Sequence, residues 1–454
     1  MDYSTLPTVM MASTLGLDGL ELSDKCHHDV LEAFLYNSVH SLDKESRKSV
    51  RLVGPSSRNL SDNLQRSMVT SEKHPIDLTH HRYTNLRELT VRNHVTDNLD
   101  FLDNICRPKL TTLDLSRTRV VDISALAACT RLEHLDLQQT GVANISALAA
   151  CTRLEHLSLF HTGVIDISAL AKCTHLRDLE LCCTDVIDIS ALAACSRLER
   201  LSLFRTGVTH ISALAKCTDL QDLDMSGTNV YDISVLTKCT DLRYLSLRDT
   251  SVANISGLAA CTHLERLELS GTDVEDISVL TKCSDLRELS LPNVVDISAV
   301  AACTRLEFLD LSEMGVDLCY TRVVDISVLV ACTNLRRLDL DGTSHVKDIS
   351  SLAACTHLEF LDLSHSGVVD ISALAKCTNL RYLDLSGTDI IDISVLAECT
   401  HLEDLDLSDI WVDDISVLAA CTNLRHLNLD GTYVRDISAL TACTELIVRG
   451  LKII

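Results

Sequence analysis

Cysteine recurs along this chain at regular intervals, and over long stretches the interval is 22 residues. Sixteen of the twenty cysteines mark the repeated unit, and the longest series at exact intervals of 22 residues runs from Cys129 to Cys283. A fixed period of about 20 to 30 residues is typical of solenoids, in which each unit buries its apolar residues only against its neighbours. The period therefore predicts a solenoid, an architecture that favours binding over catalysis.

Leucines within each unit indicate a short strand. In the unit that ends at Cys173, Leu157 and Leu159 lie two residues apart, so both point to the same face of a strand. Strands of successive units would stack in parallel at a spacing of about 4.8 Å. We expect them to form the concave wall of a curved coil.

The rest of the same unit indicates a turn and a short helical segment. Val164 and Ile167 would fill the core, while the hydroxyl of Thr162 would bond turn backbone. Ser168 precedes residues 169–172 (Ala-Leu-Ala-Lys) and is predicted to cap the short helical turn that they form. Cys173 would then close the unit from the convex side.

The recurring pattern Thr-x-Val-x-Asp-Ile-Ser-x-Leu resembles the 22-residue repeats of internalins. It is more similar still to the leucine-rich-repeat proteins of kinetoplastid parasites, over roughly residues 84–454. The resemblance implies an α/β fold, a leucine-rich-repeat horseshoe with a parallel concave sheet and short helical or 3-10 turns on the convex side. For function the resemblance implies only protein recognition in general, because one fold hosts many different roles.

A segment that lacks the repeat pattern precedes the repeats. Apolar periodicity predicts a helix over 27–36, a second over 44–53, and a third after Asn59 that includes Met68. The sequence thus predicts three parts: a flexible N-terminus over 1–21, a small helical module over 22–83 and the solenoid over 84–454.

Val30-Leu31-Glu32-Ala33-Phe34, followed by Ser46 to Val53, resembles the F-box of plant hormone receptors. In that family the F-box docks on the adaptor of an SCF ubiquitin ligase and the repeats select the substrate. The resemblance assigns adaptor contacts to Val30, Leu31, Phe34, Leu35, Val50, Leu52 and Val53. The sequence departs from the family at Leu22-Ser23-Asp24 and at Gly54-Pro55. The alternative is a helical cap that shields the first coil and has no ligase link.

The formal net charge of −24 limits the partners. An anionic surface repels phosphate backbones, so we expect no nucleic-acid partner. It favours a basic protein partner, with plain solubility as the alternative. The sequence shows no secretion signal and no run of 18 apolar residues, so we expect no membrane span and a cytoplasmic location, with the nucleus as the alternative. In such a reducing compartment the repeat cysteines would be reduced and buried.

Motifs that carry chemistry are missing from the sequence. It contains no phosphate-binding loop, nucleophile elbow or paired zinc-ligand motif, and Cys26-His27-His28 has no second ligand pair at zinc-site spacing. Cys182-Cys183 departs from the cysteine rhythm, and we expect at least one of the two thiols to be exposed. The prediction is a protein without enzymatic activity, cofactor or metal.

Where the units are nearly identical, a partner would be recognised by the exposed concave positions that differ between them. The middle exposed column is acidic or Ser from Asp114 to Glu268. Beside it lies an aromatic and basic group, which we take as the candidate partner-binding patch: His156, Phe160, His161, Cys182, Cys183, Arg200, Phe204, Arg205, Tyr244 and Arg248. The alternative is that its phenylalanines pack on their neighbours and only stiffen the wall. A second, weaker set is Phe308, Phe360 and Tyr382.

Two irregularities interrupt the rhythm. The interval from Cys283 to Cys303 is 20 residues, and from Cys303 to Cys332 it is 29, with an insertion at 313–321. This insertion is either a recognition loop or a decayed duplication. Trp411 stands in an otherwise polar turn, where it is either an exposed contact residue or a buried one.

Overall fold

The structure is a computed structural model that describes residues 67–70, 86–91, 99–100, 102, 107–291, 294–312 and 322–450. The chain divides into two compact units, Met1–Pro55 and Ser56–Ile454. The first unit lies outside the described residues, and with it the F-box-like residues Val30 to Val53, the Cys26-His27-His28 cluster and the predicted helices at 27–36 and 44–53. Cys106 and the insertion at 313–321 also lie outside them.

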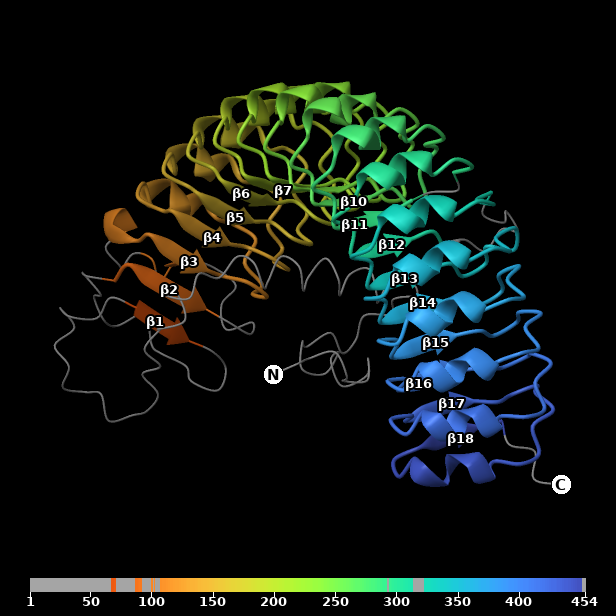
Figure 1. Cartoon of the computed structure of the whole chain (residues 1–454). Coiled ribbons are helices and arrows are strands. Elements are labelled where there is room, and N and C mark those ends of the chain that lie inside the picture. Colours follow the sequence, from red (N-terminus) through yellow and green to blue (C-terminus); the bar gives the residue numbers. More distant parts are fainter. Residues whose placement is uncertain are drawn as a thin grey trace. The chain divides into compact units, whose positions relative to one another are not determined.

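Among the described residues of the second unit, eighteen short strands form one parallel sheet, in which each strand pairs with the next along the chain (Figure 1). The strands are β1 Ser67–Thr70, β2 Glu88–Val91, β3 Thr112–Asp114, β4 His134–Asp136, β5 His156–Ser158, β6 Asp178–Glu180, β7 Arg200–Ser202, β8 Asp222–Asp224, β9 Tyr244–Ser246, β10 Arg266–Glu268, β11 Glu288–Ser290, β12 Phe308–Asp310, β13 Arg337–Asp339, β14 Phe360–Asp362, β15 Tyr382–Asp384, β16 Asp404–Asp406, β17 His426–Asn428 and β18 Ile447–Arg449.

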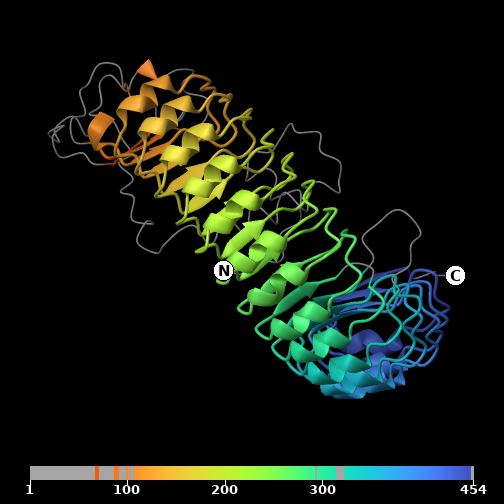
Figure 2. The same ribbon diagram turned by 90° about the horizontal axis from the view of Figure 1, so that it is seen from above.

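From β2 onwards a 3-10 turn returns the chain from each strand to the next, and Figure 2 shows these turns side by side. Their bounds are η3 Arg107–Lys109, η4 Ser124–Ala128, η5 Ser146–Ala150, η6 Ser168–Lys172, η7 Ser190–Ala194, η8 Ser212–Lys216, η9 Ser234–Lys238, η10 Ser256–Ala260, η11 Ser278–Lys282, η12 Ser298–Ala302, η13 Ser327–Ala331, η14 Ser350–Ala354, η15 Ser372–Lys376, η16 Ser394–Glu398, η17 Ser416–Ala420 and η18 Ser438–Ala442. The predicted solenoid of parallel strands and 3-10 turns is thereby confirmed for the described repeats.

Each coil buries the same set of side chains. The central leucines of neighbouring strands lie in register, as Leu135 does with Leu157 and Leu157 with Leu179. Val164 and Ile167 are buried as predicted, and Thr162 donates its hydroxyl hydrogen to the carbonyl of Leu159 at 2.8 Å. The irregular intervals do not disturb the sheet, because β12 pairs with both β11 and β13. All outward positions therefore keep one geometry along the array.

Two local predictions were wrong. Ser168 does not cap the 3-10 turn with its side chain; instead Asp166 Oδ1 accepts the Ser168 amide at 2.7 Å. The carboxylate two residues earlier reaches this amide because the turn begins at the serine. Met68 lies in β1, which pairs with β2, and not in a helix, so the sheet begins before residue 84.

Asparagine takes over this capping role in two coils. Asn144 Oδ1 accepts the Ser146 amide at 2.9 Å, and Asn254 Oδ1 accepts that of Ser256 at 2.8 Å. The amide oxygen supplies the same acceptor as the aspartate that other coils use. Side-chain oxygens of aspartate or asparagine thus accept the unpaired amide at the start of the turn, which is the role that the sequence predicted for a side-chain oxygen of serine.

The cysteine column is free and buried in the described coils, with Cys443 of the last coil partly exposed. From Cys151 to Cys421 each buried thiol of the column also donates a hydrogen bond, as Cys173 Sγ does to the carbonyl of Leu148 in the preceding coil at 3.4 Å. Burial raises the pKa of Cys173 to about 12 and that of Cys195 to about 11. The Leu148 carbonyl also accepts the amide of Cys151, so the thiol combines the bulk of a small apolar group with a second donor for that oxygen.

Within the described part of the chain, no helix has the length and apolar character that a bilayer crossing requires.

Replacing a capping aspartate should destabilise the array. The Ser234 amide holds the pKa of Asp232 below its usual value, so the carboxylate stabilises the fold above pH of about 4 and loses this effect as pH falls further. At pH 7 we expect Asp232→Ala to lower Tm by about 2 °C. Asp232→Asn should behave like the natural Asn144 coil and change Tm less. Thermal unfolding at pH 7 and pH 3 checks this; an unchanged difference at pH 3 would contradict it.

Thiol labelling should separate the cysteines by burial. Among the described cysteines, Cys183 and Cys443 are partly exposed and the others are buried. Because the thiolate is the reactive species, the buried column with its raised pKa values should resist alkylation in the folded protein. Mass spectrometry after brief labelling should find Cys183 and Cys443 modified first. Fast modification of Cys173 or Cys261 in the folded state would overturn the burial of the column.

Candidate protein-binding surface

The outward positions of the strands form a continuous set of columns, which we call the strand face. In each coil it comprises the residues on both sides of the central leucine and the first residue after the second leucine, for example His156, Ser158 and Phe160 in the coil of β5. Parallel pairing places each of these beside its counterpart in the next coil, about 4.8 Å away. The face can therefore be described column by column.

His156, Asp178 and Arg200 are brought together on β5 to β7. The Nη2 of Arg200 donates to Asp178 Oδ2 at 2.7 Å, and His156 Nδ1 lies 3.5 Å from the same oxygen. The ring of His156 also stacks on His134 with centroids 4.4 Å apart. Burial opposes ionisation of Asp178, but the hydrogen bond from His156 and the charge of Arg200 outweigh it and lower its pKa. Two of the predicted patch residues thus form one ion-paired cluster.

Burial removes Cys182 and Phe204 from the set that a partner could contact. Cys182 is 2% exposed, and its Sγ shares a 2.8 Å hydrogen bond with Ser202 Oγ. Phe204 is 8% exposed and lies beneath the guanidinium of Arg205, 5.1 Å from the ring centroid. For Phe204 the alternative interpretation, packing within the wall, describes the geometry. Of the cysteine pair, only Cys183 is partly exposed.

The other predicted residues remain accessible to different degrees. Phe160 is half-buried, and its ring lies 6.0 Å from that of the exposed His161. Tyr244 is half-buried under the guanidinium of Arg266, 5.3 Å from its centroid. Arg248 Nε lies 3.6 Å from Asp249 Oδ2. Whether this patch binds a partner stays a prediction.

His161, Cys183 and Arg205 share an unusual backbone conformation, with φ of 54°, 55° and 54°. The same position in other coils is glycine, as at Gly227 and Gly387 with φ of 64°. A side chain in this left-handed region costs about 1 kcal/mol relative to glycine. His161, Cys183 and Arg205 thus occupy a position where glycine would cost less conformational energy.

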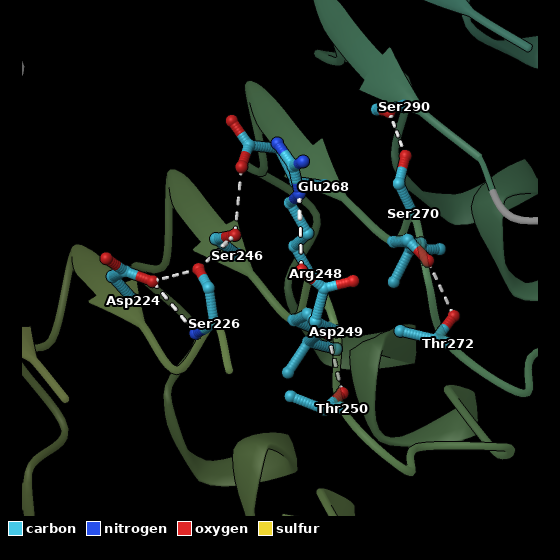
Figure 3. A network of polar contacts seen from close by, with 12 residues as sticks. Asp224, Ser226, Ser246, Arg248, Asp249, Thr250, Glu268, Ser270, Thr272 and Ser290 are labelled. Atoms are coloured by element: carbon cyan, nitrogen blue, oxygen red, sulfur yellow. Dashed lines mark hydrogen bonds and ion pairs between the residues drawn. The ribbon is translucent and has the colours of Figure 1, made fainter. Parts of the chain in front are cut away.

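In the middle column, serine alternates with an acid from β5 to β11. Each serine donates its hydroxyl to the acid of the following strand: Ser158 to Glu180 at 2.7 Å, Ser202 to Asp224 at 3.2 Å, Ser246 to Glu268 at 2.9 Å and Ser290 to Asp310 at 2.8 Å. Figure 3 shows the part of this network around Ser246, including its 2.8 Å bond with Ser226. The serines separate the negative charges and satisfy them at the same time.

From β12 to β16 this alternation stops, and five aspartates follow one another: Asp310, Asp339, Asp362, Asp384 and Asp406. All are half-buried, and each accepts the backbone amide two residues later at 2.8 to 3.0 Å. Burial, together with the charges of Asp310, Asp362 and Asp341, raises the pKa of Asp339 to about 7 although the Asp341 amide opposes this. Burial also raises the pKa of Asp362 and of Asp384.

Aromatic rings and an arginine form a stack beside these aspartates. The guanidinium of Arg337 lies between two rings, 5.7 Å from the centroid of Phe308 and 4.4 Å from that of Phe360. Phe360 then stacks on Tyr382 with centroids 4.2 Å apart and planes within 6°. The second predicted set is thus one continuous stack across β12 to β15, and it also includes Arg337, which the sequence analysis did not single out.

Most arginines next to the strand face are paired in a separate column. From β9 to β17 arginine and glutamate alternate at the residue before the strand, with Nη1 to Oε1 distances of 2.6 Å for Arg243–Glu265, 2.7 Å for Arg287–Glu307, 2.6 Å for Arg336–Glu359 and 2.8 Å for Arg381–Glu403. The opposite charges of these ion pairs cancel within their own column. The middle column therefore sets the electrostatic character of the strand face.

Trp411 is 61% exposed, and its ring stacks on Tyr433 with centroids 5.5 Å apart. Of the two alternatives for this residue, exposure is the one that the structure shows. Among the described residues, no group of three or more His, Cys, Asp or Glu is arranged to hold a metal ion.

Neutralising one aspartate of the β12–β16 column should stabilise the fold at high pH. Because the pKa of Asp339 is raised to about 7 on folding, the folded state holds a proton that the unfolded state releases above pH of about 4. Stability contributed by this proton is present at low pH and is lost as pH rises towards 7. We expect Asp339→Asn to stabilise the protein at pH 8 by about 1 kcal/mol, allowing for solvent screening, with little effect at pH 4. Thermal unfolding at both pH values measures this, and equal effects at both would contradict it.

Comparisons with known proteins identify the repeat. Two segments, 108–150 and 356–398, match a family model described as "Leucine Rich repeats (2 copies)", and 260–280 match one described as "Leucine Rich repeat". No curated protein sequence matches the chain. These models describe the repeat itself, and no enzyme family is among them.

Solved structures share the fold. An internalin from Listeria monocytogenes is 25% identical, with a TM-score of 0.52 over 76% of this chain and 87% of the internalin. A leucine-rich-repeat protein of Leptospira interrogans is 16% identical, with a TM-score of 0.64 over 82% of this chain and 96% of its own. The ectodomain of the Arabidopsis thaliana receptor kinase GASSHO1/SCHENGEN3, solved in complex with CASPARIAN STRIP INTEGRITY FACTOR 2, is 20% identical with a TM-score of 0.61, over 86% of this chain and 53% of the ectodomain. The matched segments are therefore leucine-rich repeats, and the parallel sheet with its 3-10 turns is a fold that these solved structures share.

Proposed function

We propose that this chain is a non-enzymatic recognition protein that binds a protein partner on its strand face. The observation that carries the proposal is the contrast between the inside and the outside of the array. Buried columns repeat one residue type through the coils, as the central leucines and the cysteines do. The residue before the central leucine changes instead from His156 to Asp178 to Arg200 and later to Phe308. Variation confined to outward positions is what selective recognition by a repeat array requires.

Partly exposed aromatic residues support the same proposal. Phe160, Tyr244, Phe360 and Tyr382 are half-buried on the strand face, several of them beside an arginine. Aromatic and arginine side chains held in place by their neighbours are typical of residues that dominate binding energy. The Arabidopsis receptor ectodomain provides an example of the same fold in complex with CASPARIAN STRIP INTEGRITY FACTOR 2.

A link to an SCF ubiquitin ligase is the more specific version of this hypothesis. It rests on the F-box resemblance of residues 22–83 alone, and the alternative is a scaffold or regulatory protein without a ligase link. Substituting Leu31→Asp and Phe34→Ala in the full chain tests it. Loss of a co-purifying ligase adaptor, with other partners retained, would support the F-box; absence of any adaptor from the unmodified chain would exclude it. The kinetoplastid origin of the repeat pattern and a cytoplasmic location likewise stay predictions from the sequence.

Affinity purification from native cells tests the recognition function. One variant would alter β5 to β9 of the strand face (His156→Ala, Phe160→Ala and Arg248→Ala), and a second would alter β14 and β15 (Phe360→Leu and Tyr382→Leu). The control would alter exposed residues of the 3-10 turns, Lys172→Ala and Lys216→Ala. We expect at least one strand-face variant to lose a specific partner by tenfold or more, with the control unchanged.

The opposite pattern would reject the proposal. If the turn variant loses its partners and both strand-face variants keep them, recognition lies on the other side of the array. Circular dichroism of each variant confirms that the coils remain folded.

A further inference from the structure

The strand face has two electrically different halves. From β5 to β9 it carries four acids, Asp178, Glu180, Asp222 and Asp224, and two arginines, Arg200 and Arg248. From β12 to β16 it carries seven aspartates, Asp310, Asp339, Asp341, Asp362, Asp384, Asp404 and Asp406, and a single arginine, Arg337. The second half is therefore a strongly acidic surface with an aromatic stack at its centre, which we call the β12–β16 surface.

The protein itself shows what this surface can hold. Arg337 places its guanidinium between the rings of Phe308 and Phe360, next to the aspartate column. A planar cation over aromatic faces gains about 0.5 to 2 kcal/mol, and guanidinium stacks better than ammonium because it is planar and weakly hydrated. Tyr382 continues the stack beyond Phe360, and strand pairing puts Asp404 beside it in the next coil. A guanidinium over Tyr382 would meet the same kind of environment, with Asp384 and Asp406 in the adjoining column.

Crowding of like charges indicates that this surface gains from a cation. Five successive coils present a carboxylate in the middle column, whereas the coils from β5 to β11 place a serine between two acids. Carboxylates about 4.8 Å apart repel each other, and burial strengthens the repulsion. Backbone amides compensate each aspartate, but no arginine or lysine of the middle column separates them.

The spacing of the column matches an extended peptide. Five strands at about 4.8 Å span about 19 Å. Side chains on one side of an extended peptide repeat every 6.6 Å or so, so four of them cover about 20 Å. A segment that crosses the strands could thus present four arginines to the whole column.

We propose that the β12–β16 surface binds an extended segment of a partner protein that carries arginine at alternate positions. This inference rests on the proposed recognition function and names its ligand class. The aspartate column attracts and orients the segment, and the stack that ends at Tyr382 selects guanidinium over ammonium. The mixed patch on β5 to β9 would then contact other parts of the same partner.

Fluorescence anisotropy with the full chain tests the inference. The probe is a labelled peptide with four Arg-Ser repeats, compared with Lys-Ser and Glu-Ser versions of equal length. We expect the arginine peptide to bind more tightly than the lysine peptide, the glutamate peptide not to bind, and the affinity to fall as salt is raised.

Conservative variants locate the site without disturbing the fold. The double variant Asp362→Asn and Asp384→Asn keeps the oxygen that accepts the amides of Ser364 and Ser386, yet it removes two charges. We expect it to weaken the arginine peptide at least tenfold. Tyr382→Leu, which keeps an apolar side chain, should weaken it about threefold and reduce the preference for arginine over lysine. Glu275→Gln with Glu398→Gln changes net charge equally at exposed positions outside the strand face and should leave affinity unchanged.

Two results would overturn the inference: no binding of the arginine peptide, or equal weakening by the aspartate pair and the glutamate control, which would mean nonspecific attraction to net charge. Neither result affects the proposed function if a cellular partner still depends on the strand face. If the cellular partner is insensitive to every strand-face variant while the peptide binds as expected, the proposed function fails and only the surface chemistry stands.

Discussion

Every side chain of this array lies beside the same position of the next coil, and this single constraint governs the rest of the structure. With strands in parallel register, like residues meet like residues at the distance of one strand spacing. For leucine this alignment is favourable, because identical apolar side chains build a continuous core. For a thiol it is also favourable, since each cysteine of the column from Cys151 to Cys443 reaches a carbonyl of the coil before it. For a charged residue that is repeated in the next coil the alignment is unfavourable, because its nearest neighbour then carries the same charge.

The outward columns show how the chain handles that conflict. Before the strands, arginine alternates with glutamate and the charges pair. In the middle column serine alternates with acids over β5 to β11. Aspartates follow one another as a pair on β3 and β4, Asp114 and Asp136, and as a run of five over β12 to β16, where the pKa of Asp339 rises to about 7 through burial and its acidic neighbours. Aromatic side chains respond differently to the same alignment, since Phe360 and Tyr382 simply stack.

The fold could be predicted well, because the repeat period and the apolar positions that become buried can both be read from the sequence. The leucines, the cysteine column and the hydroxyl of Thr162 all behave as expected. Local errors arose where two residue types competed for one role: Asp166 takes the capping bond assigned to Ser168. The site was harder to predict, because position in a column does not reveal how deeply a ring sinks between neighbours, and Phe204 is buried where Phe160 is not. The five-aspartate run was readable in the sequence, by following the middle column beyond Glu268.

Translational symmetry carries a hazard that the irregular coils help to limit. In a perfect array, a strand could pair with the next but one, loop out a coil and recover nearly all of its contacts, so such misaligned states would compete during folding. The intervals of 20 residues between Cys283 and Cys303 and 29 residues between Cys303 and Cys332 break that equivalence. A shift by one coil that satisfies the regular half leaves the chain too short or too long at β12, although the native register passes through it undisturbed. The irregular coils thus act as a frame marker that fixes which coil is which, and so keeps the acidic half of the strand face in one defined place.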